Sequence, residues 1–242
     1  GVTTNAHDGV RNATARHMHE VYTAMAEARM VLCLHGETPG EFVLDRETRF
    51  LSSLAEIAKT HPTLKIVLEH VTTADAVEWI LRYQGNNVAA TITAHHLDLT
   101  LDDVIGDMLR PHHFCKPVAK RPEDRQALWN AIQRGNPRFF LGSDSAPHLR
   151  IMKEHAEGCA GVFTAPILLP LLATLFERRT CLDLLESFTS THGAAFYGLP
   201  LSDRKVKLER QPMTVPFEYS DVMDSGVVPL YAGKTLPWRL VV

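Results

Sequence analysis

The sequence has few cysteines, and they are not arranged in pairs. Its four cysteines, Cys33, Cys115, Cys159 and Cys181, are widely spaced, and no two of them form a CxxC pair. This excludes a disulfide framework as the organising feature of the fold. The pattern is typical of reduced thiols, and we therefore expect a cytoplasmic protein.

Long apolar runs and an excess of charge of one sign are also absent. The longest apolar stretches, such as 165–176, are too short and too often interrupted by proline to span a bilayer. The polar opening, residues 1–10, lacks the basic start and apolar run of a signal peptide. Because 25 basic and 28 acidic residues leave a net charge of only -3, neither nucleic acid nor an anionic membrane is expected as the main partner.

Apolar runs alternate with amphipathic segments along most of the chain. Strands are predicted over 30–35, 64–70, 88–93 and 138–144, and helices over 8–29, 46–59, 73–83, 122–135, 164–178 and 181–197. A loop is predicted over 97–121. Near-continuous apolar strands between helices are typical of a parallel sheet covered on both faces. We therefore predict an α/β fold in a single domain over 1–242, with strands and helices in 1–200 and an irregular tail in 201–242.

Side chains that can bind metals follow the predicted strands, in a sequence with 13 histidines. His35 and His70 end the first two strands, His95 and His96 follow the third, and Asp144 ends the fourth. In a parallel α/β barrel, the carboxyl ends of the strands open on one face, where active sites are built. Two imidazoles and a carboxylate suit a catalytic Zn²⁺, and a carboxylate beside its water can transfer protons. The alternative is that each histidine is a hydrogen-bonded loop residue.

Several short segments, taken in order, resemble one enzyme family. They are HGE at 35–37, LEHVTT at 68–73, RPH at 110–112, GSDSAPH at 142–148, GCAG at 158–161 and YAGKTLPW at 231–238. The ordered set resembles the dihydroorotases, which belong to the amidohydrolase superfamily of metal-dependent barrel enzymes. The resemblance is strongest to the bacterial and fungal type that acts as a separate enzyme, and it covers nearly the whole chain.

The resemblance implies a TIM-type (β/α)8 barrel and a zinc-dependent activity. The reaction is the interconversion of dihydroorotate and N-carbamoyl-L-aspartate in pyrimidine biosynthesis. The family has a binuclear Zn²⁺ centre, in which His35, His70 and Asp144 would match metal ligands. Asp144 would also be the catalytic acid–base group, which takes a proton from the attacking hydroxide and delivers it to the leaving amide nitrogen.

The resemblance also implies a set of groups that contact the substrate. His148 and the backbone at Ala160 would hold the substrate carboxylate, and the backbone at Lys116 would contact the ring. Thr3 and Thr4 would match paired threonines of a mobile loop that closes over the bound substrate. The implied partners are a small anionic substrate and a second copy of the chain in a homodimer.

The family pattern is incomplete in this sequence. The HxH pair of the family's first strand and its metal-bridging carbamylated lysine are absent from the chain. The HMH at 17–19 lies in a predicted helix, where residues i and i+2 point to different faces, and is interpreted as surface. We therefore expect this chain to match the C-terminal two-thirds of the enzyme, without the first barrel strands and without a complete metal site.

Alternatives to this function remain open. The chain could be another amidohydrolase of the hydantoinase or phosphotriesterase kind, or a barrel without activity that serves as a structural subunit. Cys115 lies near basic residues, but no base can be assigned to it, and a packing role is favoured. His95 and His96 are interpreted as structural residues or as neighbours of the metal ligands.

Overall fold

The centre of the structure is a four-stranded parallel sheet in the order β1-β2-β3-β4. This computed structural model describes residues 9–220 and 225–241, so Thr3 and Thr4 lie outside the described residues. The strands are β1 (Val31–Leu34), β2 (Lys65–Leu68), β3 (Val88–Ile92) and β4 (Phe139–Leu141). All four lie where the apolar runs predict them, and their parallel order confirms the α/β fold.

The longer helices alternate with the strands in the order that the sequence predicts, beginning with a helix before β1. They include α1 (Arg16–Glu27), α2 (Arg46–Thr60), α3 (Ala74–Arg82), α6 (Pro122–Gln133), α8 (Leu168–Arg178) and α9 (His192–Tyr197). The first helix begins later than predicted, because Asn12 accepts a hydrogen bond from the backbone of Thr14 at 3.1 Å and forms a turn there. No helix among the described residues is long and apolar enough to cross a membrane.

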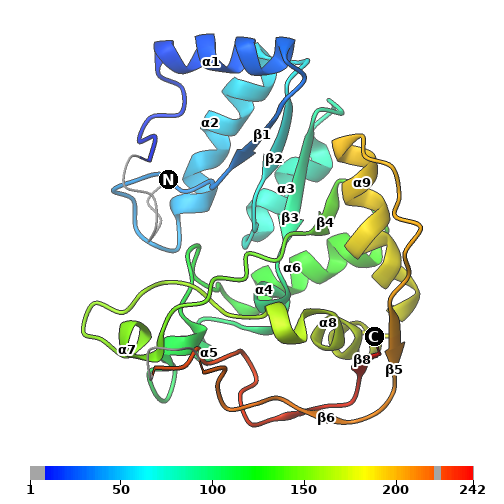
Figure 1. Cartoon of the computed structure of the whole chain (residues 1–242). Helices are drawn as coiled ribbons and strands as arrows, with labels where there is room; N and C mark the ends of the chain where they lie inside the picture. Colours follow the sequence, from blue (N-terminus) through cyan, green and yellow to red (C-terminus); the bar gives the residue numbers. More distant parts are fainter. Residues whose placement is uncertain (1–8, 221–224, 242) are drawn as a thin grey trace.

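Short elements occupy the segment that the sequence predicts as a loop. These are α4 (Ala94–Asp98), α5 (Asp102–Ile105) and a 3₁₀ turn (Pro111–His113). Thr93 begins α4, because its hydroxyl accepts a hydrogen bond from the backbone N–H of His96 at 3.0 Å. Figure 1 shows α4, α5 and α7 (Arg150–Lys153) below the sheet, beyond the carboxyl ends of its strands.

The remaining elements lie in the last third of the chain. There are 3₁₀ turns over Ala165–Ile167 and Leu182–Leu184, and a π-helical turn over Ser187–Thr191. In the tail, β5 (Lys207–Glu209) pairs with β8 (Arg239–Val241), and β6 (Met213–Thr214) pairs with β7 (Thr235–Leu236). The tail therefore carries two antiparallel ladders, where the sequence predicts only irregular structure.

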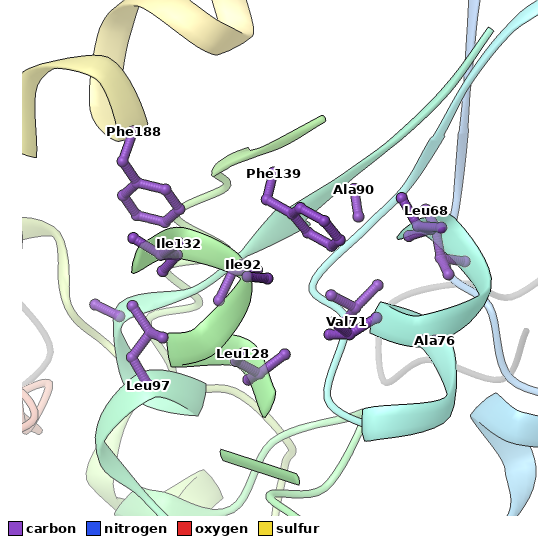
Figure 2. Close-up of a cluster of buried hydrophobic side chains, with 14 of the residues drawn as sticks. Leu68, Val71, Ala76, Ala90, Ile92, Leu97, Leu128, Ile132, Phe139 and Phe188 are labelled. Atoms are coloured by element: carbon purple, nitrogen blue, oxygen red, sulfur yellow. The ribbon is translucent and has the colours of Figure 1, made fainter. Parts of the chain in front are cut away.

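The core lies between the sheet and the helices that pack on it. Figure 2 shows Leu68 of β2, Ile92 of β3 and Phe139 of β4 together with Leu128 and Ile132 of α6. The opposite face of the strands is also covered, since Val67, Ala89 and Phe140 form a second, smaller apolar cluster with Phe196 and Tyr197. Burial of both faces explains why the strands are continuously apolar.

Candidate metal centre and substrate pocket

The first two strands bring two histidines together at their carboxyl ends. Leu34 of β1 is paired with Leu68 of β2, so His35 and His70 follow at nearly the same level of the sheet. His35 Nδ1 and His70 Nε2 lie 3.1 Å apart, and the two rings meet edge to face with centroids 4.8 Å apart. Two residues that are far apart in sequence thus direct one nitrogen each at a common point.

Asp144 reaches the same region from the loop that follows β4. It is close enough to His35 and Glu69 for their charges to act on its carboxyl group. Desolvation raises the pKa of Asp144 to about 6, while His35 lowers it and Glu69 raises it. Gly142 permits this approach, because a side chain there would collide with Thr91 of β3. The carboxyl group of Asp144 is therefore mostly ionised at neutral pH, which lies only slightly above its pKa.

Backbone strain marks the positions of His70 and Asp144. Both have positive φ angles, +42° and +37°, which non-glycine residues rarely adopt and which concentrate at functional sites. Thr91 holds the strained His70, because its hydroxyl accepts a hydrogen bond from the His70 N–H and donates to Glu69 Oε2, each at 2.6 Å. The strain is thus maintained by a specific neighbouring strand.

Glu37 orients His35. Its Oε2 lies 2.9 Å from His35 Nε2, which places the ring proton on Nε2 and leaves the lone pair of Nδ1 facing His70. Gly36 makes this turn possible, because a side chain there would collide with Leu68 and Phe50. Glu37 is not among the site residues that the sequence predicts. The spacing of His35 and Glu37 around a glycine is the signal that the sequence offers for it.

The donor set fits a metal ion. Burial and the nearby His35 lower the pKa of His70 to about 3, so its imidazole is neutral and able to coordinate. Imidazole nitrogens and a carboxylate are ligands that Zn²⁺ accepts. His70 Nδ1 and Glu37 Oε1 are buried without a hydrogen-bond partner among the described residues. His35, His70 and Asp144 are therefore suited to form part of a metal centre.

Two loops beside these residues carry the other predicted positions. His148 forms a hydrogen bond with the backbone of Ala160, and burial lowers its pKa. The loops that carry the two residues are joined, since the Ala146 N–H donates to the Val162 carbonyl at 3.1 Å. His148 Nε2 is buried without a partner among the described residues and can donate to or accept from a ligand.

Lys153 of α7 ties the loop of Ala160 to the loop of Lys116. Its ammonium donates to the carbonyls of Phe114, Cys159 and Gly161 at 2.9, 2.8 and 2.6 Å, and the residue is only 3% exposed. Burial lowers its pKa to about 8, which leaves the group largely charged at neutral pH. Lys153 is not among the residues that the sequence predicts, because nothing in a helix as short as α7 indicates that its lysine is buried.

Comparisons with known proteins give a consistent result, although no protein-family profile matches the chain. A dihydroorotase of Aromatoleum aromaticum is 45% identical over 244 residues, which cover 100% of this chain and 70% of that relative. The crystal structure of dihydroorotase in complex with 5-fluoroorotic acid from Saccharomyces cerevisiae matches with a TM-score of 0.92 and 39% identity, over 100% of this chain and 71% of that one. The L-hydantoinase of Arthrobacter aurescens has a TM-score of 0.76 at 18% identity over 96% of this chain and 58% of that one, which is a likeness of fold alone.

Proposed function

Since the chain belongs to the dihydroorotase family, we propose that His35, His70 and Asp144 form part of its metal centre and that Asp144 is its acid–base group. The activity is that of the family, the reversible hydrolysis of dihydroorotate to N-carbamoyl-L-aspartate in pyrimidine biosynthesis. The fold is part of the amidohydrolase barrel. The observation that supports the assignment of residues best is the 3.1 Å approach of His35 Nδ1 and His70 Nε2.

The proposed cofactor is Zn²⁺ in a binuclear centre. The bound metal supplies positive charge that polarises the substrate carbonyl and lowers the pKa of water. His35, His70 and Asp144 are the three ligands of that centre that this chain contains. The carbamylated lysine and the HxH pair of the family have no counterpart in its 242 residues.

Asp144 moves the proton. Its carboxylate takes a proton from the attacking water at one carboxyl oxygen and then delivers it to the ring nitrogen as the amide bond breaks. A carboxyl group with a pKa of about 6 suits both steps, because it is ionised at neutral pH yet needs little free energy to hold a proton. Glu37 keeps His35 in the tautomer that leaves its Nδ1 free to coordinate.

The two loops joined by Lys153 bind the anionic substrate. His148 and the backbone of Ala160 hold its carboxylate, and the backbone at Lys116 contacts its ring. Lys153 fixes the distance between these loops, because its ammonium donates to the backbone carbonyls of Phe114, Cys159 and Gly161. Thr3 and Thr4 lie outside the described residues, and their contact with the substrate stays a prediction.

Asp144→Ala in the full-length enzyme tests this assignment. Loss of a positioned acid–base group lowers the rate by about 10²- to 10⁴-fold, and loss of a metal ligand adds to this. We expect turnover of dihydroorotate to fall at least that far while the far-UV circular dichroism spectrum stays unchanged. Turnover within a few-fold of the parent would refute the role of Asp144.

Two further measurements separate the alternatives. A hydantoinase would hydrolyse hydantoin faster than dihydroorotate, and a structural subunit without activity would bind no metal at His35, His70 and Asp144. We expect the opposite in both cases, with dihydroorotate preferred and at least two zinc ions per chain of the complete enzyme.

We also propose that the enzyme is a cytoplasmic homodimer. The four cysteines are free, which is consistent with a reducing compartment. Light scattering after size exclusion gives the mass directly, and a monomer mass would contradict the proposed dimer.

A further inference from the structure

A second cluster of metal-binding side chains lies beside the first. His95 and His96 open α4 directly after β3, and Cys115 lies in the loop that precedes α6. Their ligand atoms all lie within 4.8 Å of one another. The three residues are 0%, 3% and 2% exposed, so the cluster is closed to solvent.

His95 is a buried polar residue of this cluster. Both of its ring nitrogens are buried, and neither has a hydrogen-bond partner among the described residues. A neutral imidazole carries one donor and one acceptor, and buried polar groups of this kind are nearly always satisfied. The ring packs against His96, with centroids 4.5 Å apart, and thus faces a second imidazole.

The other atoms of the cluster have the spacing of a coordination shell. Cys115 Sγ lies 3.4 Å from His96 Nε2, and the Pro117 carbonyl oxygen lies 3.0 Å from Nε2 and 3.2 Å from Sγ. Tetrahedral zinc with its usual bond lengths places neighbouring ligand atoms about 3.3–3.6 Å apart. A cation therefore fits between these three atoms with small adjustments.

We propose that His95, His96 and Cys115 bind a thiophilic divalent cation such as Zn²⁺, with the Pro117 carbonyl as the fourth ligand. This site is separate from the one formed by His35, His70 and Asp144. Sulfur and imidazole ligands with no open position are typical of structural zinc sites.

Protons move when the cation binds. The Cys115 thiol loses its proton to solvent and coordinates as the thiolate. His96 coordinates through Nε2, and its ring proton then resides on Nδ1, 2.8 Å from the Thr93 hydroxyl that accepts it. His95 enters as the neutral imidazole. The thiolate offsets part of the positive charge that Lys120 and Lys153 bring to this region, and Asp144 lies near enough to act on Cys115 as well.

The position of the site indicates a structural role for the cation, which is to hold a substrate-binding loop in place. Cys115 directly precedes Lys116, whose backbone we propose to contact the substrate ring, while the two histidines are anchored to β3. A bound cation would fix this loop to the sheet, as Lys153 fixes it to the loop of Ala160.

Cobalt substitution tests the proposal through its absorption spectrum. Bound Co²⁺ gives a near-ultraviolet charge-transfer band only where a thiolate coordinates it, and the proposed catalytic centre contains no sulfur ligand. We expect the full-length enzyme loaded with Co²⁺ to show this band. The band should be lost in Cys115→Ser and kept in Cys181→Ser, which alters another buried free cysteine.

A second variant changes a proposed ligand but keeps every thiol, and it tests whether the band is lost because the protein has misfolded. His95→Gln should lose the band and bind one metal ion fewer per chain while its far-UV circular dichroism stays that of the parent. Absence of the band in the parent at saturating Co²⁺, or its persistence in Cys115→Ser, would overturn the proposal. Asp144→Ala should keep the band, so failure of this site and failure of the proposed catalytic assignment are separate results.

Discussion

Two groups of buried polar side chains flank the end of β2, and they differ in whether their polar atoms are hydrogen-bonded. Glu47 of α2 is 1% exposed, yet its carboxylate accepts hydrogen bonds from the backbone and hydroxyl groups of Thr72 and Thr73 at 2.5–3.0 Å. Two residues before Thr72, His70 leaves Nδ1 without a hydrogen-bond partner among the described residues and has a strained backbone with a positive φ angle. A cluster with paired polar atoms thus lies next to one that leaves a polar atom unpaired among the described residues.

The difference separates stability from function. Every hydrogen bond to Glu47 fixes the turn between β2 and α3, so this cluster supports the fold. The unpaired atoms around His70 lower the stability of the metal-free chain but leave coordination positions available. A variant of Glu47 should therefore lower the stability of the fold, whereas a variant of His70 should lower metal binding and activity.

Glu47→Ala should cause the largest loss of stability. It leaves the buried N–H groups of Thr72 and Thr73 without a partner, and each such group costs about 1–3 kcal/mol. We expect the free energy of unfolding to fall by about 3–5 kcal/mol in urea titration, with exposed Glu56→Ala as the control. A loss below about 1 kcal/mol would mean that water replaces the carboxylate and that the two clusters do not differ.

Lys153→Met should have the next largest effect. It removes the ammonium from three carbonyls in a site that is 3% exposed, at a cost of about 2–3 kcal/mol. Because the two substrate loops then separate, KM for dihydroorotate should rise more than kcat falls. Exposed Lys59→Met is the matched control. An unchanged KM would limit Lys153 to a role in folding.

The sequence predicts the strands and the proposed metal ligands better than it predicts the residues that hold them in place. Hydrophobic periodicity places all four strands, and strand ends place His35 and His70 at one edge, because the edge of a parallel sheet follows from the strand order. Glu37 and Lys153 are not predicted, because their roles depend on hydrogen-bond partners in loops. The conformation of a loop is not encoded in any periodic pattern of the sequence. The short tail strands escape for the same reason, since β6 and β7 pair across a gap that only the folded chain closes.

His70→Asn should separate metal binding from folding. The variant removes one proposed ligand, whose ring makes a hydrogen bond from Nε2 to His35 Nδ1 at 3.1 Å and leaves Nδ1 without a partner among the described residues, so the stabilisation lost is that of one hydrogen bond, about 1 kcal/mol at most. We expect metal content and turnover to collapse while the free energy of unfolding of the metal-free chain changes by less than about 1 kcal/mol. The exposed His155→Asn serves as the control. A large loss of stability would place His70 with Glu47 in the group that supports the fold.

Asp144→Asn should change the stability in the opposite direction, towards a more stable metal-free chain. The surrounding protein raises the pKa of Asp144 from 3.8 to about 6, so the ionised group is less favourable in the folded than in the unfolded chain. The folded chain binds more protons between pH 4 and 6, and the destabilisation by Asp144 is therefore complete above pH 6 and disappears as the pH falls towards 3.8. Melting temperatures of metal-free protein should be higher for Asp144→Asn than for the parent at pH 8 and should converge near pH 4, with exposed Asp107→Asn as the control. Equal melting temperatures at pH 8 would mean that the Asp144 carboxylate is as well accommodated as that of Glu47, and the contrast between the two clusters would not extend to the acid–base group.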